Sequence, residues 1–308
     1  MTMASLQSDV IKQFYIDLSA RFKANPALDI LTLRDMFEQF QSLTAEPTGV
    51  NYEEAVAGDI RGLWCLPAEA SPDSVLLHLH GGAFVAGSPA THRKLVGHLA
   101  KAAGMKALIV DYRLAPEHPY PAPVHDGVSA YRYLLDRGFS ADRIVLSGDS
   151  AGGNLAVAIA IMLRDNGDPL PAAIACFSPW FDLALTGDSF RENADRDVFM
   201  QFDVNTWLAD MYCGENGQAD DPRISPLYAD VTGLPPLYLV AGGFEMLLDD
   251  TLRLAERARN GHVEVELEVV PEMQHAHVFM AGRAGEADDS IANAAAWLKM
   301  KMPLSRIC

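Results

Sequence analysis

The residue best suited to chemistry is Ser150, within the stretch GDSAGGN from Gly148 to Asn154. An apolar run over 143–147 predicts a buried strand before it, and a longer one predicts a helix over 151–165 after it. A sharp strand-to-helix turn strains the serine backbone and requires glycine two positions to either side, because side chains there would collide with neighbouring backbone. Gly148 and Gly152 occupy those positions. The stretch predicts an exposed nucleophile, with a plain glycine-rich turn as the alternative.

A nucleophilic serine needs N–H donors that stabilise the oxyanion formed when it attacks a carbonyl. The sequence HGGAF directly follows a predicted buried strand over 74–80 and places glycines where the backbone can approach a substrate closely. This loop and the N–H after the serine predict an oxyanion hole made of Gly81, Gly82, Ala83 and Ala151, in which Gly81 shapes the loop. His80 is expected to support the loop from behind.

The serine also needs a base and a carboxylate that orients the base. Glu245 lies just past a predicted strand over 236–242, whereas Asp249 and Asp250 fall where the next helix should begin and suit its first turn. Glu245 is therefore the predicted acid. For the base, His275 and His277 both follow a predicted strand over 264–270. Two residues apart on an extended loop, they point in opposite directions, so only one can face Ser150.

Alternating strand and helix patterns indicate how these residues are brought together. Further strands are predicted over 106–111 and 172–178, a strand pair within 53–67, and helices over 91–103, 125–137, 248–260 and 285–300. This alternation predicts an α/β fold with a mostly parallel sheet flanked by helices, whose site lies at the carboxyl ends of the strands. Residues 1–45, with helices in 5–44 and an apolar face that includes Val10, Phe14 and Leu18, and 181–225, with a helix near 203–212, are expected to form a helical cap. Residues 46–180 and 226–308 are then the core.

Composition and charge exclude several classes of protein. The chain has 308 residues, 49% of them hydrophobic, and a formal net charge of −17, which argues against nucleic acid and anionic membrane surfaces as partners. No apolar run approaches the roughly 18 residues of a membrane span, and the first residues lack a signal-peptide pattern, so a cytoplasmic location is expected. The scattered cysteines, Cys65, Cys176, Cys213 and Cys308, predict neither a zinc site nor a disulfide framework.

Over about residues 70–300 the chain resembles the hormone-sensitive-lipase-like group of α/β-hydrolases, the bacterial family IV esterases. The resemblance is carried by HGGAF, DYRLAPEHPYPAP, GDSAGGN, GFEMLLDD and EMQHAHVF, in the family's order. The chain is also similar to esterases that act on monoterpene lactones. Three positions depart from the family pattern: Ala83 replaces the third glycine, the acid is Glu245 rather than the commoner Asp, and a second histidine follows His275. The match of Met273 and His275 to the family motif favours His275 as the base.

The resemblance implies an α/β-hydrolase fold and a serine carboxylesterase that hydrolyses small to medium acyl esters through an acyl-enzyme. Ser150, Glu245 and His275 would be the catalytic residues, with no metal or cofactor, a small-molecule ester as the partner, and a possible homodimer. Hydrolysis of lactones, amides or carbamates by the same residues is the alternative. A non-catalytic ligand-binding protein on this fold is a third reading, disfavoured by the complete set of serine, acid and histidine.

Overall fold

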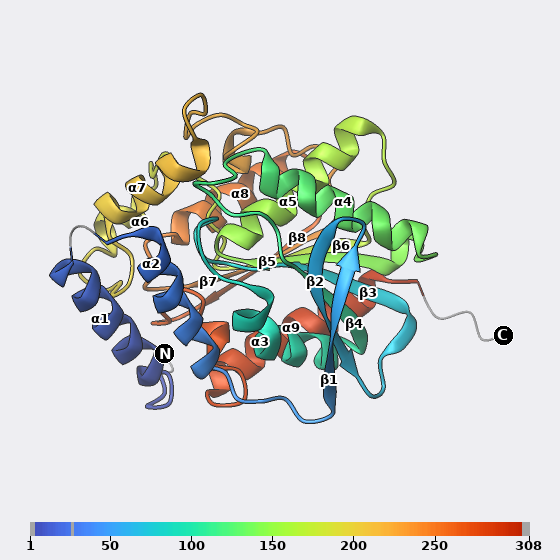
Figure 1. Ribbon diagram of the computed structural model, residues 1–308, viewed down its shortest axis with the longest axis horizontal. Coiled ribbons are helices and arrows are strands. Elements are labelled where there is room, and N and C mark those ends of the chain that lie inside the picture. The colour runs from blue at the N-terminus through green and yellow to red at the C-terminus, as the bar shows by residue number, and fades with distance from the viewer. Residues whose placement is uncertain (1–3, 26–27, 304–308) are drawn as a thin grey trace.

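The computed structural model describes residues 4–25 and 28–303, and a twisted eight-stranded sheet runs through its centre (Figure 1). The strand order is β1-β2-β4-β3-β5-β6-β7-β8; β1 and β2 pair antiparallel with their neighbours, and the other strands are parallel. The strands are β1 (Val50–Ala57), β2 (Ile60–Pro67), β3 (Ser71–Leu79), β4 (Met105–Val110), β5 (Ile144–Asp149), β6 (Ala173–Phe177), β7 (Leu237–Gly242) and β8 (Val265–Val270).

Helices cover both faces of this sheet. The α-helices are α1 (Asp9–Ala24), α2 (Ile30–Phe37), α3 (Pro89–Ala103), α4 (Ala122–Asp136), α5 (Ala151–Asn166), α6 (Ser189–Glu192), α7 (Phe202–Cys213), α8 (Leu248–Asn260) and α9 (Gly285–Lys301). Short 3₁₀ helices are η1 (Glu38–Ser42), η2 (Ala141–Arg143), η3 (Pro226–Tyr228) and η4 (His277–Met280). The core has two parts: α4, α5 and α8 pack on one face, and α3 and α9 pack together on the other.

The central strands are buried on both faces because helices cover both. Every residue of β5, β6 and β7 is buried, as expected for parallel strands that read as continuous apolar runs. The predicted α/β fold is confirmed, and the predicted strands and helices match observed elements with small differences at their ends. The predicted apolar face of the first helix is partly wrong: α1 buries Ile11, Tyr15 and Leu18, while Val10 is 49% exposed.

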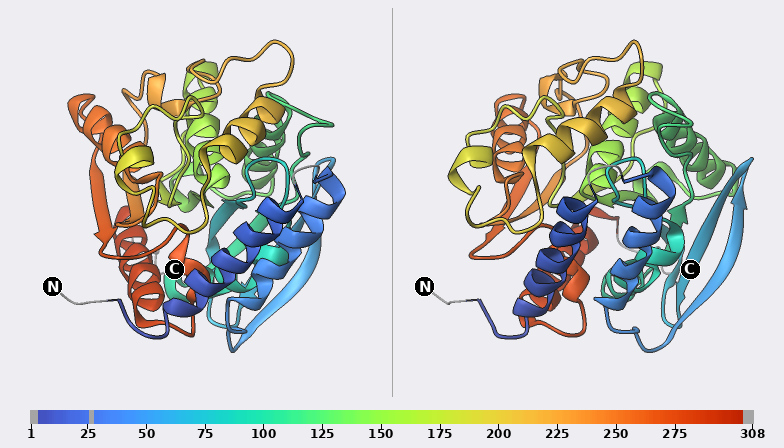
Figure 2. Two further views of the ribbon diagram at one scale, coloured as in Figure 1. Left: turned by 90° about the vertical axis from the view of Figure 1, so that its left-hand side faces the viewer. Right: turned by 60° about the vertical axis from the view of Figure 1, so that its left-hand side comes forward.

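Helices α1 and α2 lie beside the segment that carries α6 and α7, although these segments are far apart in the chain (Figure 2). The hydroxyl of Ser19 in α1 donates a hydrogen bond to the Val198 carbonyl, which lies between α6 and α7. Residues of both segments also line one pocket together with Ser150, which directly follows β5, so both segments lie near the carboxyl ends of the central strands.

The structure also bears on the predictions about membrane spans and cysteines. Within the described residues no helix has the length and apolar character needed to cross a membrane. Cys65, Cys176 and Cys213 are buried free thiols, and Cys308 lies outside the described residues.

Candidate active site

The serine turn has the strained geometry that its sequence predicts. Ser150 lies between β5 and α5 with φ 53° and ψ −122°, a backbone conformation that L-residues rarely adopt. A Cβ atom on Gly152 would lie 1.9 Å from the Leu79 carbonyl oxygen, and one on Gly148 would lie 2.2 Å from the backbone of Gly152. The Ser150 N–H donates to the Phe177 carbonyl at 2.9 Å, which ties the turn to the end of β6. Both glycines are therefore required on steric grounds.

Glu245 and His275 are brought together from the loops that follow β7 and β8. Nδ1 of His275 donates to Oε2 of Glu245 at 2.7 Å, and the other carboxylate oxygen, Oε1, accepts from the Gly242 N–H at 2.7 Å. Both side chains are buried. This arrangement fixes the histidine ring and leaves Nε2 as the nitrogen available to the pocket that Ser150 and His275 both line.

The other candidates for the acid and the base form hydrogen bonds outside the Glu245–His275 pair. Oδ2 of Asp249 accepts from the Ser189 N–H, and Oδ2 of Asp250 accepts from the N–H groups of Phe181 and Asp182. The Nε2 atom of His277 lies 3.1 Å from the Ser290 hydroxyl of α9, and burial lowers the pKa of His277 to about 4. These contacts tie each of the three side chains to a neighbouring segment instead of the Glu245–His275 pair.

The loop after β3, which the sequence predicts to supply oxyanion donors, has a backbone conformation that L-residues rarely adopt. Gly82, Ala83 and Phe84 have positive φ values of 118°, 54° and 65°. The Gly81 N–H donates to Oδ1 of Asp149 at 3.2 Å, and this hydrogen bond ties the start of the loop to the end of β5. Gly82 and Ala83 line the pocket beside Ser150.

A buried network behind this loop was missed from the sequence. Nε2 of His78 lies 3.3 Å from Oδ1 of Asp149, and Nε2 of His92 lies 3.3 Å from Oδ2. Burial alone would raise the pKa of Asp149, but the contacts with His92 and His78 outweigh it and hold that pKa below its usual range. His92 is a buried residue of α3. Its contact with Asp149 joins α3 to the end of β5 across 57 positions of the chain, so no local sequence pattern reveals it.

His80 lies next to this network and supports the same loop, as expected. Its Nδ1 donates to the Gly81 carbonyl at 2.8 Å, and its ring stacks on Tyr112 with centroids 4.2 Å apart. Burial lowers the pKa of His80 to about 3, so the ring is neutral at pH 7.

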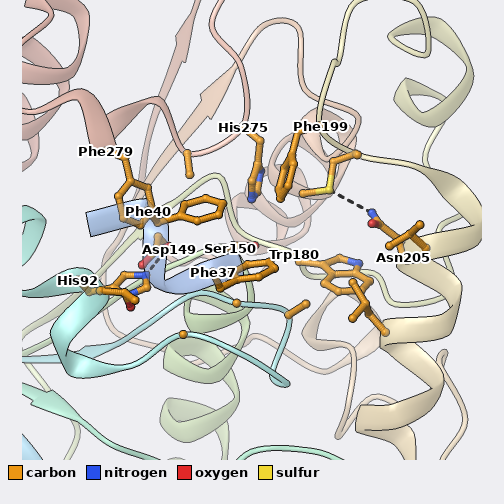
Figure 3. A pocket seen from close by; sticks show the side chains of 18 of the residues that line it. Phe37, Phe40, His92, Asp149, Ser150, Trp180, Phe199, Asn205, His275 and Phe279 are labelled. Atoms are coloured by element: carbon orange, nitrogen blue, oxygen red, sulfur yellow. Dashed lines mark hydrogen bonds and ion pairs between the residues drawn. The ribbon is translucent and has the colours of Figure 1, made fainter. Parts of the chain in front are cut away.

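The pocket above Ser150 is mostly apolar and aromatic (Figure 3). Trp180 and Phe199 line it, whereas Phe84 does not and stacks on Tyr212 with centroids 3.7 Å apart. Phe202 and Trp207 of α7 are partly exposed to solvent and do not line the pocket. The N-terminal segment and η4 supply the remaining aromatic lining residues, Phe22, Phe37, Phe40 and Phe279. Across residues 4–25 and 28–303, no group of three or more His, Cys, Asp and Glu side chains is placed to hold a metal ion.

Comparisons with known proteins agree with this geometry. Residues 76–279 match the model of a family described as having the alpha/beta hydrolase fold. An acetyl-hydrolase of Streptomyces hygroscopicus is 41% identical over 241 residues, which cover 77% of this chain and 78% of that protein. An esterase of Acinetobacter venetianus is 35% identical over 263 residues, covering 85% and 86% of the two chains.

The similarity extends to solved structures. The crystal structure of an esterase from the bacterial hormone-sensitive lipase family superposes with a TM-score of 0.91 at 39% identity, and the match covers 98% of this chain and 100% of that one. The chain thus belongs to the α/β-hydrolase family, within the bacterial hormone-sensitive lipase group, and is a carboxylic ester hydrolase.

Proposed function

We propose that the chain is a serine carboxylesterase whose catalytic residues are Ser150, His275 and Glu245. The observation that supports this most strongly is the 2.7 Å hydrogen bond between His275 Nδ1 and Glu245 Oε2 beside a strained serine in one pocket. In this arrangement the buried carboxylate holds the proton on Nδ1, so Nε2 is free to accept the proton of Ser150.

Hydrolysis then proceeds in two halves, acylation of Ser150 and hydrolysis of the acyl-enzyme. Ser150 Oγ attacks the acyl carbon while Nε2 of His275 takes its proton; the C–O ester bond breaks and the alcohol leaves with that proton. A water molecule next gives one proton to Nε2 and attacks the acyl-enzyme. The bond to Oγ breaks, Oγ recovers the proton, and the carboxylic acid is released.

The oxyanion formed in each half is stabilised by backbone N–H groups. In the proposal Gly82 and Ala83 donate from the loop after β3, and Ala151 donates from the first turn of α5. Donors that are already in place cost no reorganisation as the charge develops, which is why such groups contribute strongly. Gly81 shapes the loop through its hydrogen bond to Asp149.

The proposed substrates are esters with small to medium acyl groups. Large aromatic side chains from 1–45 and 181–225, together with Trp180 and Phe279, surround the serine and limit the room for a long chain. In this proposal residues 1–45 and 181–225 form the cap over the core of 46–180 and 226–308.

Acyl-chain preference tests this proposal. With p-nitrophenyl esters from acetyl to palmitoyl, only the acyl chain changes, so kcat/KM should be highest for short chains and fall for long ones. The Ser150→Ala variant, assayed in parallel, reports any hydrolysis that does not depend on the serine. A maximum at palmitoyl would contradict the proposed substrate size. Serine-dependent cleavage of lactones, anilides or carbamates with no ester turnover would instead support the alternative, a hydrolase of lactones, amides or carbamates.

A further inference from the structure

A short segment between α6 and α7 contacts both loops that carry the proposed acid and base. We call residues 193–200 the strap. Nδ2 of Asn193 donates to the Glu245 carbonyl at 2.9 Å, and Oδ2 of Asp197 accepts from the Met246 N–H at 2.8 Å. The other oxygen of Asp197 accepts from the N–H groups of Phe199 and Met200 at 2.8 and 2.9 Å. The strap therefore braces the loop of Glu245 at two neighbouring residues.

The same strap also holds the loop of His275. The Val198 N–H donates to Oε1 of Gln274 at 3.0 Å, and Nε2 of Gln274 donates to the Arg196 carbonyl at 2.9 Å. This reciprocal pair fixes the residue next to His275 in the chain. Phe199 lies beside the His275 ring, with centroids 6.0 Å apart.

Helix α1 supports the base loop from the opposite end of the sequence. The Tyr15 hydroxyl donates to the His275 carbonyl at 2.9 Å, and its ring stacks on Phe199 with centroids 4.4 Å apart. Tyr15 is fully buried, and burial raises the pKa of its hydroxyl, so the group remains a donor. One buried phenol thus joins α1 to both the strap and the proposed base.

We infer that Tyr15, Asn193 and Asp197 are positioning residues that set the Glu245–His275 pair through the backbone of its two loops. The two loops follow different strands, so the 2.7 Å contact between their side chains depends on the relative placement of their backbones. None of these three side chains lines the pocket, so they act through the loops of Glu245 and His275 and not on the substrate. This inference rests on the proposed function.

The Tyr15→Phe substitution tests the inference with little structural change, since it removes one hydroxyl and keeps the stacked ring. A hydrogen bond is worth about 1 kcal/mol, so kcat should fall about 5-fold to 10-fold. KM should stay within about twofold, because the pocket lining is unchanged. Looser contact between Glu245 and His275 stabilises the imidazolium less, so the acidic limb of kcat/KM should move to lower pH.

The matched control is Tyr131→Phe, which removes another buried hydroxyl that donates to a carbonyl, that of Pro169, at 2.9 Å. It should lower thermal stability to a similar extent but leave kcat and the pH profile unchanged. Asp197→Asn gives a second test from the side of the acid. Asparagine has only one acceptor oxygen, so it loses either the hydrogen bond from the Met246 N–H or those from the Phe199 and Met200 N–H groups. It should reproduce the loss of kcat.

A double-mutant comparison with Glu245 distinguishes a positioning role of Tyr15 from general stabilisation of the fold. In a Glu245→Gln background, Tyr15→Phe should cost less than about twofold, since the contact it adjusts is already lost. Equal costs in both backgrounds, or a Tyr15→Phe variant with wild-type kcat and pH profile, would overturn the inference. If Ser150→Ala kept wild-type activity, the proposed function itself would fail, which is a distinct result.

Discussion

Replacement of Ser150 by alanine is expected to lower kcat for ester hydrolysis by about 10⁴-fold or more, with KM little changed. The substitution deletes the attacking oxygen but keeps the small side chain that the strained turn accommodates. Proton transfer by His275 and the donors of the glycine loop then have no nucleophile to assist. Steady-state kinetics with p-nitrophenyl butyrate measure the loss.

A fold control accompanies this measurement. The alanine variant should unfold at a temperature close to that of the wild type, because the substitution removes only a hydroxyl and keeps the backbone hydrogen bond from the residue 150 N–H to the Phe177 carbonyl. Ser178→Ala is a matched serine substitution at the end of β6, where the hydroxyl accepts from the Ala276 N–H. It should keep far more activity than Ser150→Ala. Similar residual activity in the two variants would argue against Ser150 as the nucleophile.

Replacement of Glu245 by glutamine is expected to lower kcat by roughly 10³-fold to 10⁴-fold while substrate binding is retained. The amide can still accept from the Gly242 N–H with its oxygen, which turns its NH₂ group toward Nδ1 of His275. Nδ1 must then accept, so the ring proton moves to Nε2. The histidine can no longer take the proton of Ser150 at that nitrogen.

Asp249→Asn is the matched control for the acid, since it also replaces a carboxylate by an amide close to the same loop. Asp249 accepts from the Ser189 N–H, so its substitution should affect stability more than kcat. The kinetic constants of both variants, measured over pH 5 to 9, decide the assignment. A large loss of kcat in Asp249→Asn and a small one in Glu245→Gln would show that the predicted acid is wrong.

The fold was predictable because its signals are local. Apolar runs such as 143–147 mark strands buried on both faces, and the glycines around Ser150 mark the single backbone shape possible there. The loop that carries Glu245 could be found because it directly follows a strand. The face of α1 was less predictable, since Tyr15 is buried by tertiary contacts with Phe199 and His275 that helical periodicity does not contain.

Long-range contacts account for what the sequence did not reveal. Asp149 meets His78 because β3 and β5 are adjacent in the sheet. It also meets His92, which lies on α3 and is 57 positions away in the chain. The strap joins residues that are 49 to 78 positions apart in the chain, by hydrogen bonds to backbone groups that have no sequence signature. Pairings of this kind depend on the assembled fold, so they appear only with the structure.

Labelling with a p-nitrophenyl phosphonate, followed by mass spectrometry of the intact protein and its peptides, shows whether Ser150 is the residue that forms the covalent intermediate. We expect one phosphonyl group per chain, attached to the peptide that contains Ser150, with loss of esterase activity in parallel and no labelling of Ser150→Ala. Attachment to another residue, or equal labelling of the alanine variant, would contradict this role of Ser150.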